Sequence, residues 1–198
     1  MSQTTVSSER VWMKHYPQES LNAVFPRMKV YSFLKECNKD RPNHPILYYY
    51  GAKITVRDLL ERIDRCADAF AALGVKKGDT VSLLSASTPQ SIISLYALNK
   101  MGAIVNAIDP RMDVKSITRM ICSSGSQILM AIDIAYPKVA KILKDINQKH
   151  IIIQSAATSL PLLKKIAMKL ATRSAIPYGK SGIMSWDTFI KGSKNGKA

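Results

Sequence analysis

Two short segments of the sequence carry residue types that bind phosphate groups. Gly179-Lys180-Ser181 matches the second half of the motif G-x-x-x-x-G-K-[ST], in which backbone amides and a lysine hold a nucleotide. The first glycine of that motif would stand at position 174, which is Ser174, and Pro177 interrupts the loop. The other segment, residues 123–126, reads Ser-Ser-Gly-Ser without a following Gly-x-Pro-Lys, which favours a helix end that turns into a strand.

Acidic residues, histidines and cysteines provide few further candidates for chemistry. Asp109 and Asp113 could pair as acid and base, but a turn and a helix N-cap explain them more simply. The three histidines and three cysteines are scattered, without metal-ligand spacing or a C-x-x-C. We therefore predict no catalytic, cofactor-binding or metal residue in this chain, and a reduced, cytoplasmic location.

Length and composition are typical of one folded domain. The chain has 198 residues, 46% of them apolar, and a net charge of +15. It contains no apolar run long enough to span a membrane, and its polar start lacks a secretory signal.

Helix and strand signals alternate along the middle of the chain. Thr55 with Asp58 predicts a capped helix that Gly74 ends, and Thr88 with Pro89 predicts a second helix. We expect Gly102 to end this second helix and Asp113 to cap a third, while Pro137 opens a fourth that runs to about Asn147. Strands are expected to begin about every 24 residues, near Thr80, Ala103, Gln127 and Ile151. This order predicts an α/β fold: a doubly wound, mostly parallel sheet with helices on both faces.

The predicted organisation has three parts. Residues 1–27 form a lead-in, in which residues 12–17 would lay the N-terminus onto the domain through aromatic side chains. Residues 28–155 form the α/β subdomain, which opens with a helix at 28–39 and a hairpin whose first strand is 46–50. Residues 156–198 form a basic amphipathic helix and a C-terminal extension.

Several motifs resemble the adenylate-forming acyl-CoA synthetase superfamily of AMP-dependent synthetases and ligases. Residues 54–59, Ile-Thr-Val-Arg-Asp-Leu, are similar to its (L/I)-T-Y-x-E-L signature, and residues 73–81 match LGV-x-KGD-x-V. Residues 97–111 follow its A-x-x-K-x-G-A…(N/D)-P-R signature. The lead-in at 12–17 and Trp-Asp-Thr-Phe-Ile at 186–190 look most like long-chain fatty acyl-CoA ligases.

The resemblance implies a two-step reaction for the complete enzyme. ATP and a carboxylic acid form an acyl-adenylate, and the CoA thiol then displaces AMP. The family uses ATP, Mg and CoA, and it needs a Ser/Thr/Gly-rich loop ending in Pro-Lys and a later lysine. This sequence contains neither, so we expect an N-terminal portion of a ligase that is inactive alone. The missing remainder, or a companion chain, would be its partner.

A basic helix near the end suggests a different function. Two-thirds of the net positive charge lies after residue 137, and residues 159–173 have helical periodicity. This helix could dock on an anionic membrane, or its apolar face could pack on the protein while its cations are solvated. The alternative function is therefore a non-catalytic interaction or membrane-docking module, and no motif supports nucleic-acid binding. We also expect self-association through exposed apolar surface. The candidate membrane-surface residues are Lys164, Lys165, Lys169 and Arg173.

Overall fold

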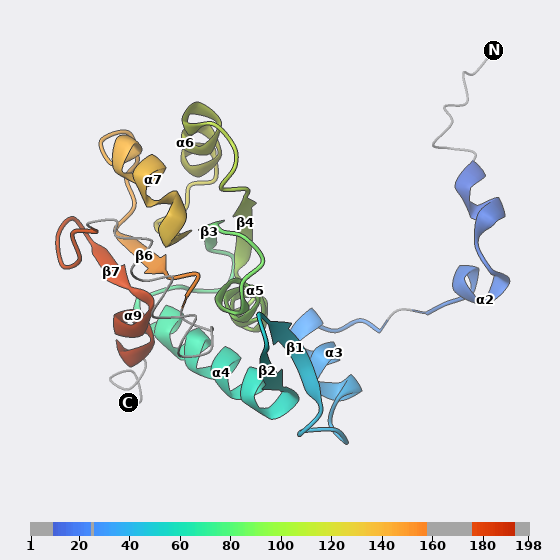
Figure 1. The fold of residues 1–198 in the computed structure, drawn as a ribbon. Coiled ribbons are helices and arrows are strands. Elements are labelled where there is room, and N and C mark those ends of the chain that lie inside the picture. The colour runs from blue at the N-terminus through green and yellow to red at the C-terminus, as the bar shows by residue number, and fades with distance from the viewer. Residues whose placement is uncertain (1–9, 25, 158–175, 193–198) are drawn as a thin grey trace, which may run out of the picture.

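A five-stranded parallel sheet lies at the centre of the computed structural model, which describes residues 10–24, 26–157 and 176–192 (Figure 1). Its strand order is β4-β3-β5-β6-β7, so the chain moves first to one side of β3 and then to the other. All four neighbouring pairs are parallel, which confirms the predicted doubly wound α/β fold. The strands are β3 (Thr80–Leu84), β4 (Ile104–Ile108), β5 (Ile128–Ile132), β6 (His150–Gln154) and β7 (Ile183–Ser185).

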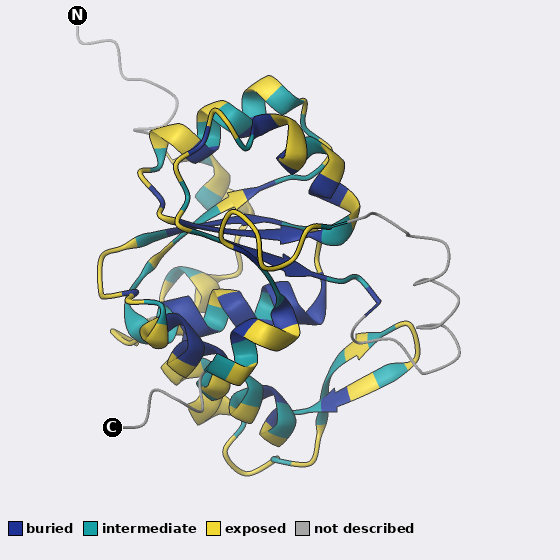
Figure 2. Cartoon of the chain, turned by 90° about the vertical axis from the view of Figure 1, so that its left-hand side faces the viewer, coloured by how far each residue is buried: buried dark blue, intermediate teal, exposed yellow. Residues whose placement is uncertain are grey.

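Helices cover both faces of this sheet (Figure 2). One layer holds α4 (Val56–Ala72), α5 (Pro89–Met101) and α9 (Trp186–Gly192), with α4 packed on the other two. The other layer holds α6 (Val114–Ser123) and α7 (Tyr136–Ile142). Strand residues alternate between the two apolar layers, as the two-residue period of a strand requires. Val81, Leu83, Ile128, Met130 and Ile152 face the first layer, and Leu84, Leu129, Ala131, Ile151 and Ile153 face the second.

The predicted helix signals act locally as expected. Thr55 and Asp58 form a capping box, in which the Asp58 N–H donates to Thr55 Oγ1 over 3.2 Å. Thr88 accepts a hydrogen bond from the Ser91 N–H over 3.3 Å at the start of α5. Gly102 ends α5 at a φ of 78°, a left-handed backbone that glycine adopts without strain.

The predicted fourth helix is shorter than expected. The helix α7 ends at Ile142, where the Asp145 N–H donates to the Ile142 carbonyl over 2.9 Å and turns the chain. Ile146 then enters the core at 7% exposure. The chain reaches the next strand through an exposed turn and the buried Ile146 rather than through a helix that runs to Asn147.

The N-terminal elements are smaller and less covered. A hairpin of β1 (Pro45–Tyr49) and β2 (Ala52–Thr55) follows α3 (Val30–Cys37). The Tyr31 hydroxyl donates to Asp64 Oδ1 over 2.8 Å, and this bond ties α3 to α4. Burial and the Asp64 carboxylate raise the pKa of Tyr31 to about 12.

The lead-in lies apart from the body. Its two short helices, η1 (Val11–His15) and α2 (Gln18–Leu21), extend away from the sheet and its layers (Figure 1). Trp12 is 47% exposed and Tyr16 is 56% exposed. The prediction that these aromatic side chains lay the N-terminus onto the domain is therefore wrong. The division into parts at residues 27 and 155 is not tested and stays a prediction.

Candidate functional site at the carboxyl edge of the sheet

Loops that follow three parallel strands meet at one edge of the sheet. In open α/β sheets, ligands bind at this carboxyl edge, where the strand order reverses. Here the reversal falls at β3, which lies between β4 and β5. A cavity of about 580 Å³ opens there between residues 85–87 after β3, residues 109–111 after β4, and Ile134 after β5. This volume lies in the range of small-molecule sites.

A buried network of hydroxyl groups fixes the loop after β3. Ser91 Oγ lies 2.6 Å from Ser85 Oγ and 2.8 Å from Thr88 Oγ1, and it donates to the Ala86 carbonyl over 2.8 Å. The Gln154 side chain joins this network from the end of β6. Its Nε2 donates to Ser91 Oγ over 3.1 Å and also to Ser85 Oγ. The loop is therefore hydrogen-bonded to both its own helix and a distant strand.

Gln154 is the most unusual member of this network. The residue is 1% exposed, and no described residue hydrogen-bonds its shielded Oε1. A buried amide oxygen without a donor is unfavourable. Ser85, Ser91 and Gln154 were not predicted as site residues from the sequence. The available signal was polar residues directly after apolar strands, with Gln154 ending the run Ile151-Ile152-Ile153.

An exposed ion pair shapes the loop after β4. Arg111 Nη2 lies 2.6 Å from Asp109 Oδ2, and the Arg111 N–H donates to Asp109 Oδ1 over 2.8 Å. Hydrogen bonding to Arg111 lowers the pKa of Asp109 to about 2. Lys138 Nζ donates to the carbonyls of Pro110 and Met112 over 2.8 and 2.7 Å. The loop is therefore hydrogen-bonded both within itself and to Lys138, and it holds a guanidinium at the rim of the cavity.

This edge has the groups to bind a polar ligand rather than to activate a nucleophile. Its hydrogen-bond donors are hydroxyls, a carboxamide and one guanidinium. Among the described residues, the hydrogen bonds of Ser85 and Ser91 lead to each other, to Thr88, to Gln154 and to a backbone carbonyl. None of these bonds leads to a histidine or a carboxylate, so neither serine is paired with a base as an activated nucleophile is.

The structure supports the simpler interpretation of the two aspartates. Asp113 Oδ1 accepts a hydrogen bond from the Ser116 N–H over 2.9 Å and caps α6. The Asp109 carbonyl accepts from the Met112 N–H over 3.2 Å in a turn. The two carboxylates therefore have separate roles: Asp113 caps α6, and Asp109 pairs with Arg111.

The two glycine-containing segments are also structural. Residues 179–181 form a turn before β7, in which the Gly179 N–H donates to the Ile183 carbonyl over 2.8 Å. A phosphate loop would lead from a strand into a helix, and this segment leads into a strand instead. At residues 123–126, α6 ends and Ser126 Oγ accepts from the Ser82 N–H over 3.0 Å.

The described part of the chain offers neither a metal site nor a membrane-spanning helix. No group of three or more His, Cys, Asp or Glu residues there could hold a metal ion. No helix in the same part is long and apolar enough to cross a membrane. The basic helix at 159–173 lies outside the described residues, so its membrane contact stays a prediction for Lys164, Lys165, Lys169 and Arg173.

Comparison with known proteins identifies the family. The family of AMP-binding enzymes matches residues 34–177. The long-chain-fatty-acid–CoA ligase of Bacillus subtilis (strain 168) is 24% identical over 172 residues, which cover 86% of this chain and 31% of that protein. The 3-hydroxypropionyl-coenzyme A synthetase of Sulfurisphaera tokodaii is 22% identical over 183 residues, or 89% of this chain and 26% of that protein.

A solved structure agrees in fold. The anthranilate CoA ligase AuaEII, in complex with anthranoyl-AMP, superposes with a TM-score of 0.68 at 18% identity, over 84% of this chain and 29% of that one. The parallel α/β sheet and the family match together define the class: this chain belongs to the AMP-binding enzyme family of adenylate-forming proteins. It spans less than a third of the length of these relatives.

Proposed function

We propose that this chain forms the first α/β unit of an ATP-dependent acid–CoA ligase, with a fatty acid as the substrate class. The observation that carries the proposal is the placement of the two signatures. The first leads into α4 and then β3, and the second leads from α5 through β4 to Arg111. The second therefore ends at the carboxyl edge, beside the reversal of strand order, and the first ends where β3, the strand at which the order reverses, begins. The match to a long-chain-fatty-acid–CoA ligase over 86% of this chain supports the choice of substrate class.

The carboxyl edge would then form one wall of the substrate site. The loop after β3 is held by the hydroxyl network and Gln154, and the loop after β4 by Lys138 and the Asp109–Arg111 pair. These contacts would fix the wall before substrates bind, so that it needs no reordering. ATP, Mg and CoA belong to the complete enzyme, because this chain has no phosphate loop ending in Pro-Lys.

Because this chain contains no phosphate loop ending in Pro-Lys, we predict that the 198 residues do not form acyl-adenylate by themselves. The test is ATP–pyrophosphate exchange by the purified chain with fatty acids of several lengths, with acetate as a second acid. We expect exchange no faster than a protein-free blank. Exchange above the blank with any acid would show that residues 1–198 carry the complete chemistry, and it would overturn the proposal.

The native gene provides a second test, which asks where the missing phosphate loop is encoded. We expect the reading frame beyond the codon for Ala198, or a companion gene, to encode a Ser/Thr/Gly-rich loop that ends in Pro-Lys. The complete protein, or the two chains mixed, should then catalyse exchange and form the CoA thioester. If the native protein has the mass of this chain, 22.0 kDa, and no second chain restores exchange, a non-catalytic interaction module is the better explanation.

A further inference from the structure

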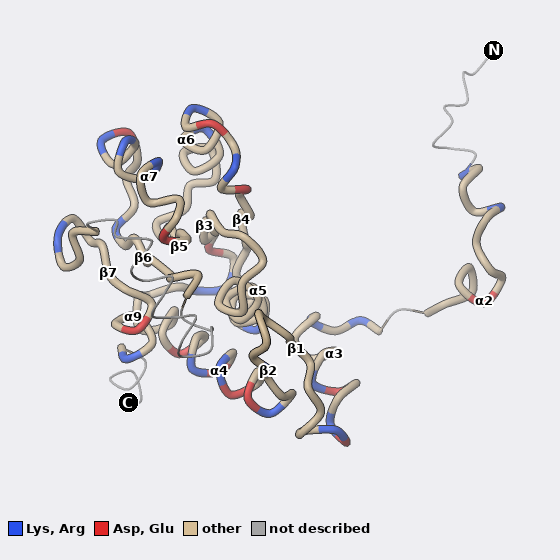
Figure 3. The backbone as a smooth tube through the Cα atoms, viewed as in Figure 1, with Lys and Arg blue, Asp and Glu red and all other residues tan. Residues whose placement is uncertain are grey.

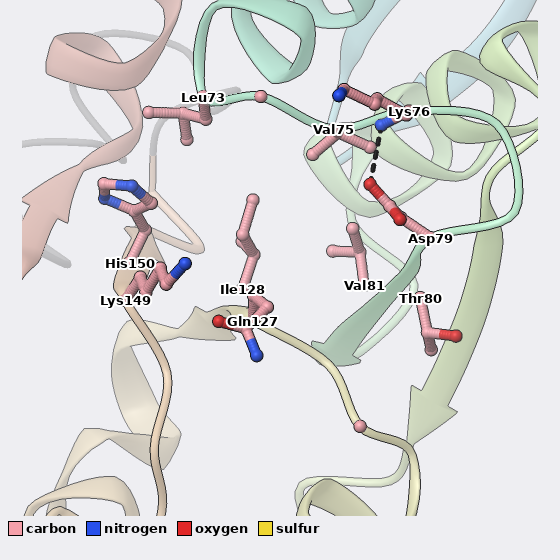
Figure 4. A pocket seen from close by; sticks show the side chains of 12 residues that line it. Leu73, Val75, Lys76, Asp79, Thr80, Val81, Gln127, Ile128, Lys149 and His150 are labelled. Carbon is pink, nitrogen blue, oxygen red and sulfur yellow. Dashed lines mark hydrogen bonds between the residues drawn. The ribbon is translucent and has the colours of Figure 1, made fainter.

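A second cavity lies at the opposite, amino-terminal edge of the sheet. It has a volume of about 340 Å³ and opens between the starts of β3, β5 and β6 and the turn that follows α4 (Figure 4). Parallel strands run from this edge toward the carboxyl edge, so the cavity is separated from the candidate substrate wall by the length of the sheet. Much of its lining, from Leu73 to Val81, belongs to the signature segment at residues 73–81.

The floor of this cavity is apolar. Val81 and Ile128 lie at its centre and are 1% and 3% exposed, and Val75 is 8% exposed (Figure 4). Leu73 lines the side nearest α4. A ligand that reaches this floor must therefore bury apolar surface of its own.

The rim is basic. Lys149, His150 and Gln127 come from one side of the cavity, and Lys76 comes from the other (Figure 4). Within the described residues, neither lysine forms an ion pair. The one acid, Asp79, already accepts a hydrogen bond from the Lys76 backbone N–H over 2.7 Å. The rim thus carries two ammonium groups and one carboxylate, and that carboxylate is engaged in its own turn.

The two lysines of this rim come from segments that are far apart in the sequence. Lysines and arginines are spread over loops and helices, and the five strands of the sheet contain none (Figure 3). Lys149 directly precedes β6 and Lys76 precedes β3, so the fold brings these two cations to one opening. His150 adds an imidazole whose Nδ1 is shielded and has no hydrogen-bond partner among the described residues.

We propose that this cavity binds a small organic anion with a compact apolar body. The anionic group lies between Lys149 and Lys76 and accepts hydrogen bonds from the lysines and from the Gln127 amide. The apolar body rests on Val81 and Ile128. The volume, at the lower end of the range for ligand sites, limits the ligand to a compact one such as a short acid or an aryl phosphate.

The test uses phenyl phosphate as the probe. Inorganic phosphate, which has the anionic group but no apolar ring, is the control. Ligand-observed ³¹P NMR of the full 198-residue chain, at fixed ionic strength, measures binding whether the protein is monomeric or associated. We expect saturable binding of phenyl phosphate, at least fivefold tighter than that of inorganic phosphate. Equal binding of the two probes would show that the apolar floor is not used, and it would overturn the proposal.

Charge-removing variants locate the site. Lys149→Gln and Lys76→Gln remove one cation each from opposite sides of the cavity, and we expect each to weaken phenyl phosphate binding at least fivefold. Lys144→Gln removes the same charge from an exposed turn outside the cavity and is expected to change binding less than twofold. If all three variants weaken binding equally, the anion is held by net charge alone and the site does not exist.

Discussion

Aromatic side chains are more exposed in the N-terminal segment, residues 10–55, than in the core of the sheet body, although Tyr31 in that segment is only 8% exposed. In the body, Phe70 is 0% exposed and Phe189 3% exposed, and their ring centroids lie 4.8 Å apart. In the N-terminal segment, Phe33 is 47% and Tyr48 67% exposed. Because both regions contain similar side chains, their difference in exposure follows from the number of helix and sheet layers that cover them.

Topology explains the contrast. The parallel sheet has a helical layer on each face, and every strand can bury both sets of side chains. The β1–β2 hairpin has only two strands, which are marginal by themselves. The hairpin reaches the far part of the body through the Tyr49 hydroxyl, which donates to the Ala156 carbonyl over 3.1 Å. The N-terminal segment therefore leaves more of its aromatic side chains uncovered than the core of the body does.

A pair of matched phenylalanine substitutions tests the contrast most directly. Phe70→Ala empties a fully buried position, and we expect a loss of about 3–5 kcal/mol in the free energy of unfolding. Phe33→Ala acts on a half-exposed side chain of α3, and we expect a loss of less than about 1 kcal/mol. Urea denaturation of both variants and the parent measures the two losses. Similar losses in both variants would mean that Phe33 packs as closely as Phe70 does, and the contrast in exposure would not hold.

A second pair of substitutions tests the polar network at the carboxyl edge. Gln154→Ala removes the amide that donates to Ser91 Oγ, and a loss of about 1–3 kcal/mol is expected because buried hydroxyls lose a partner. Gln127→Ala changes an exposed glutamine that precedes the neighbouring strand, with an expected change within about 0.5 kcal/mol.

The outcome for Gln154 also bears on the proposed function. The unpaired Oε1 is lost in the same variant, and this loss offsets part of the cost. If thermal and urea unfolding show that Gln154→Ala is as stable as the parent, the network does not hold the loop after β3. The wall proposed for the substrate site would then lack its main support.

The sequence predicts the local parts of this structure well. The caps at Thr55, Thr88 and Asp113 and the glycine at 102 depend on neighbours within a few residues, and all four are confirmed. The doubly wound order follows from the alternation of helices and strands.

Features that join distant residues could not be predicted in this way. Gln154 contacts a serine 69 positions away, and nothing in either local segment specifies that partner. The strand β7 has three residues and follows a turn, so it is too short for a periodic signal. Both cavities arise where several loops meet. The individual roles of Asp109 and Asp113 were predictable, but the cavity beside Asp109 was not.

A smaller effect is expected at the start of α4, where the N-terminal segment joins the body. Thr55→Ala removes the capping hydroxyl, and we expect a loss of about 1 kcal/mol near pH 7. Thr118→Ala is the matched control. The Thr118 hydroxyl only donates back to the Val114 carbonyl within α6, over 2.9 Å, and alanine is a good helix former.

The pH dependence of this variant follows from Asp58. Hydrogen bonding to Thr55 holds the pKa of the Asp58 carboxyl below its usual value. The ionised carboxylate therefore stabilises the fold above the pKa of an unfolded aspartate, and this contribution is lost as the pH falls through the lowered value. Unfolding curves at several pH values are expected to show the difference between Thr55→Ala and the parent shrinking below about pH 4. A difference that is constant with pH would exclude Asp58 as its partner.

The smallest effect on folding is expected where the N-terminal segment faces outward. The double substitution Phe33→Ser with Tyr48→Ser removes two exposed aromatic side chains, and we expect the free energy of unfolding to change by less than about 1 kcal/mol. Self-association, measured by sedimentation velocity over a range of concentrations, is expected to weaken about tenfold, which corresponds to about 1.4 kcal/mol. Tyr178→Ser alters an aromatic side chain of the body that is 49% exposed, and it is expected to leave association unchanged. A parent protein that stays monomeric at every concentration would mean that the exposed aromatic face does not bind a second copy, and that its partner must be a different surface.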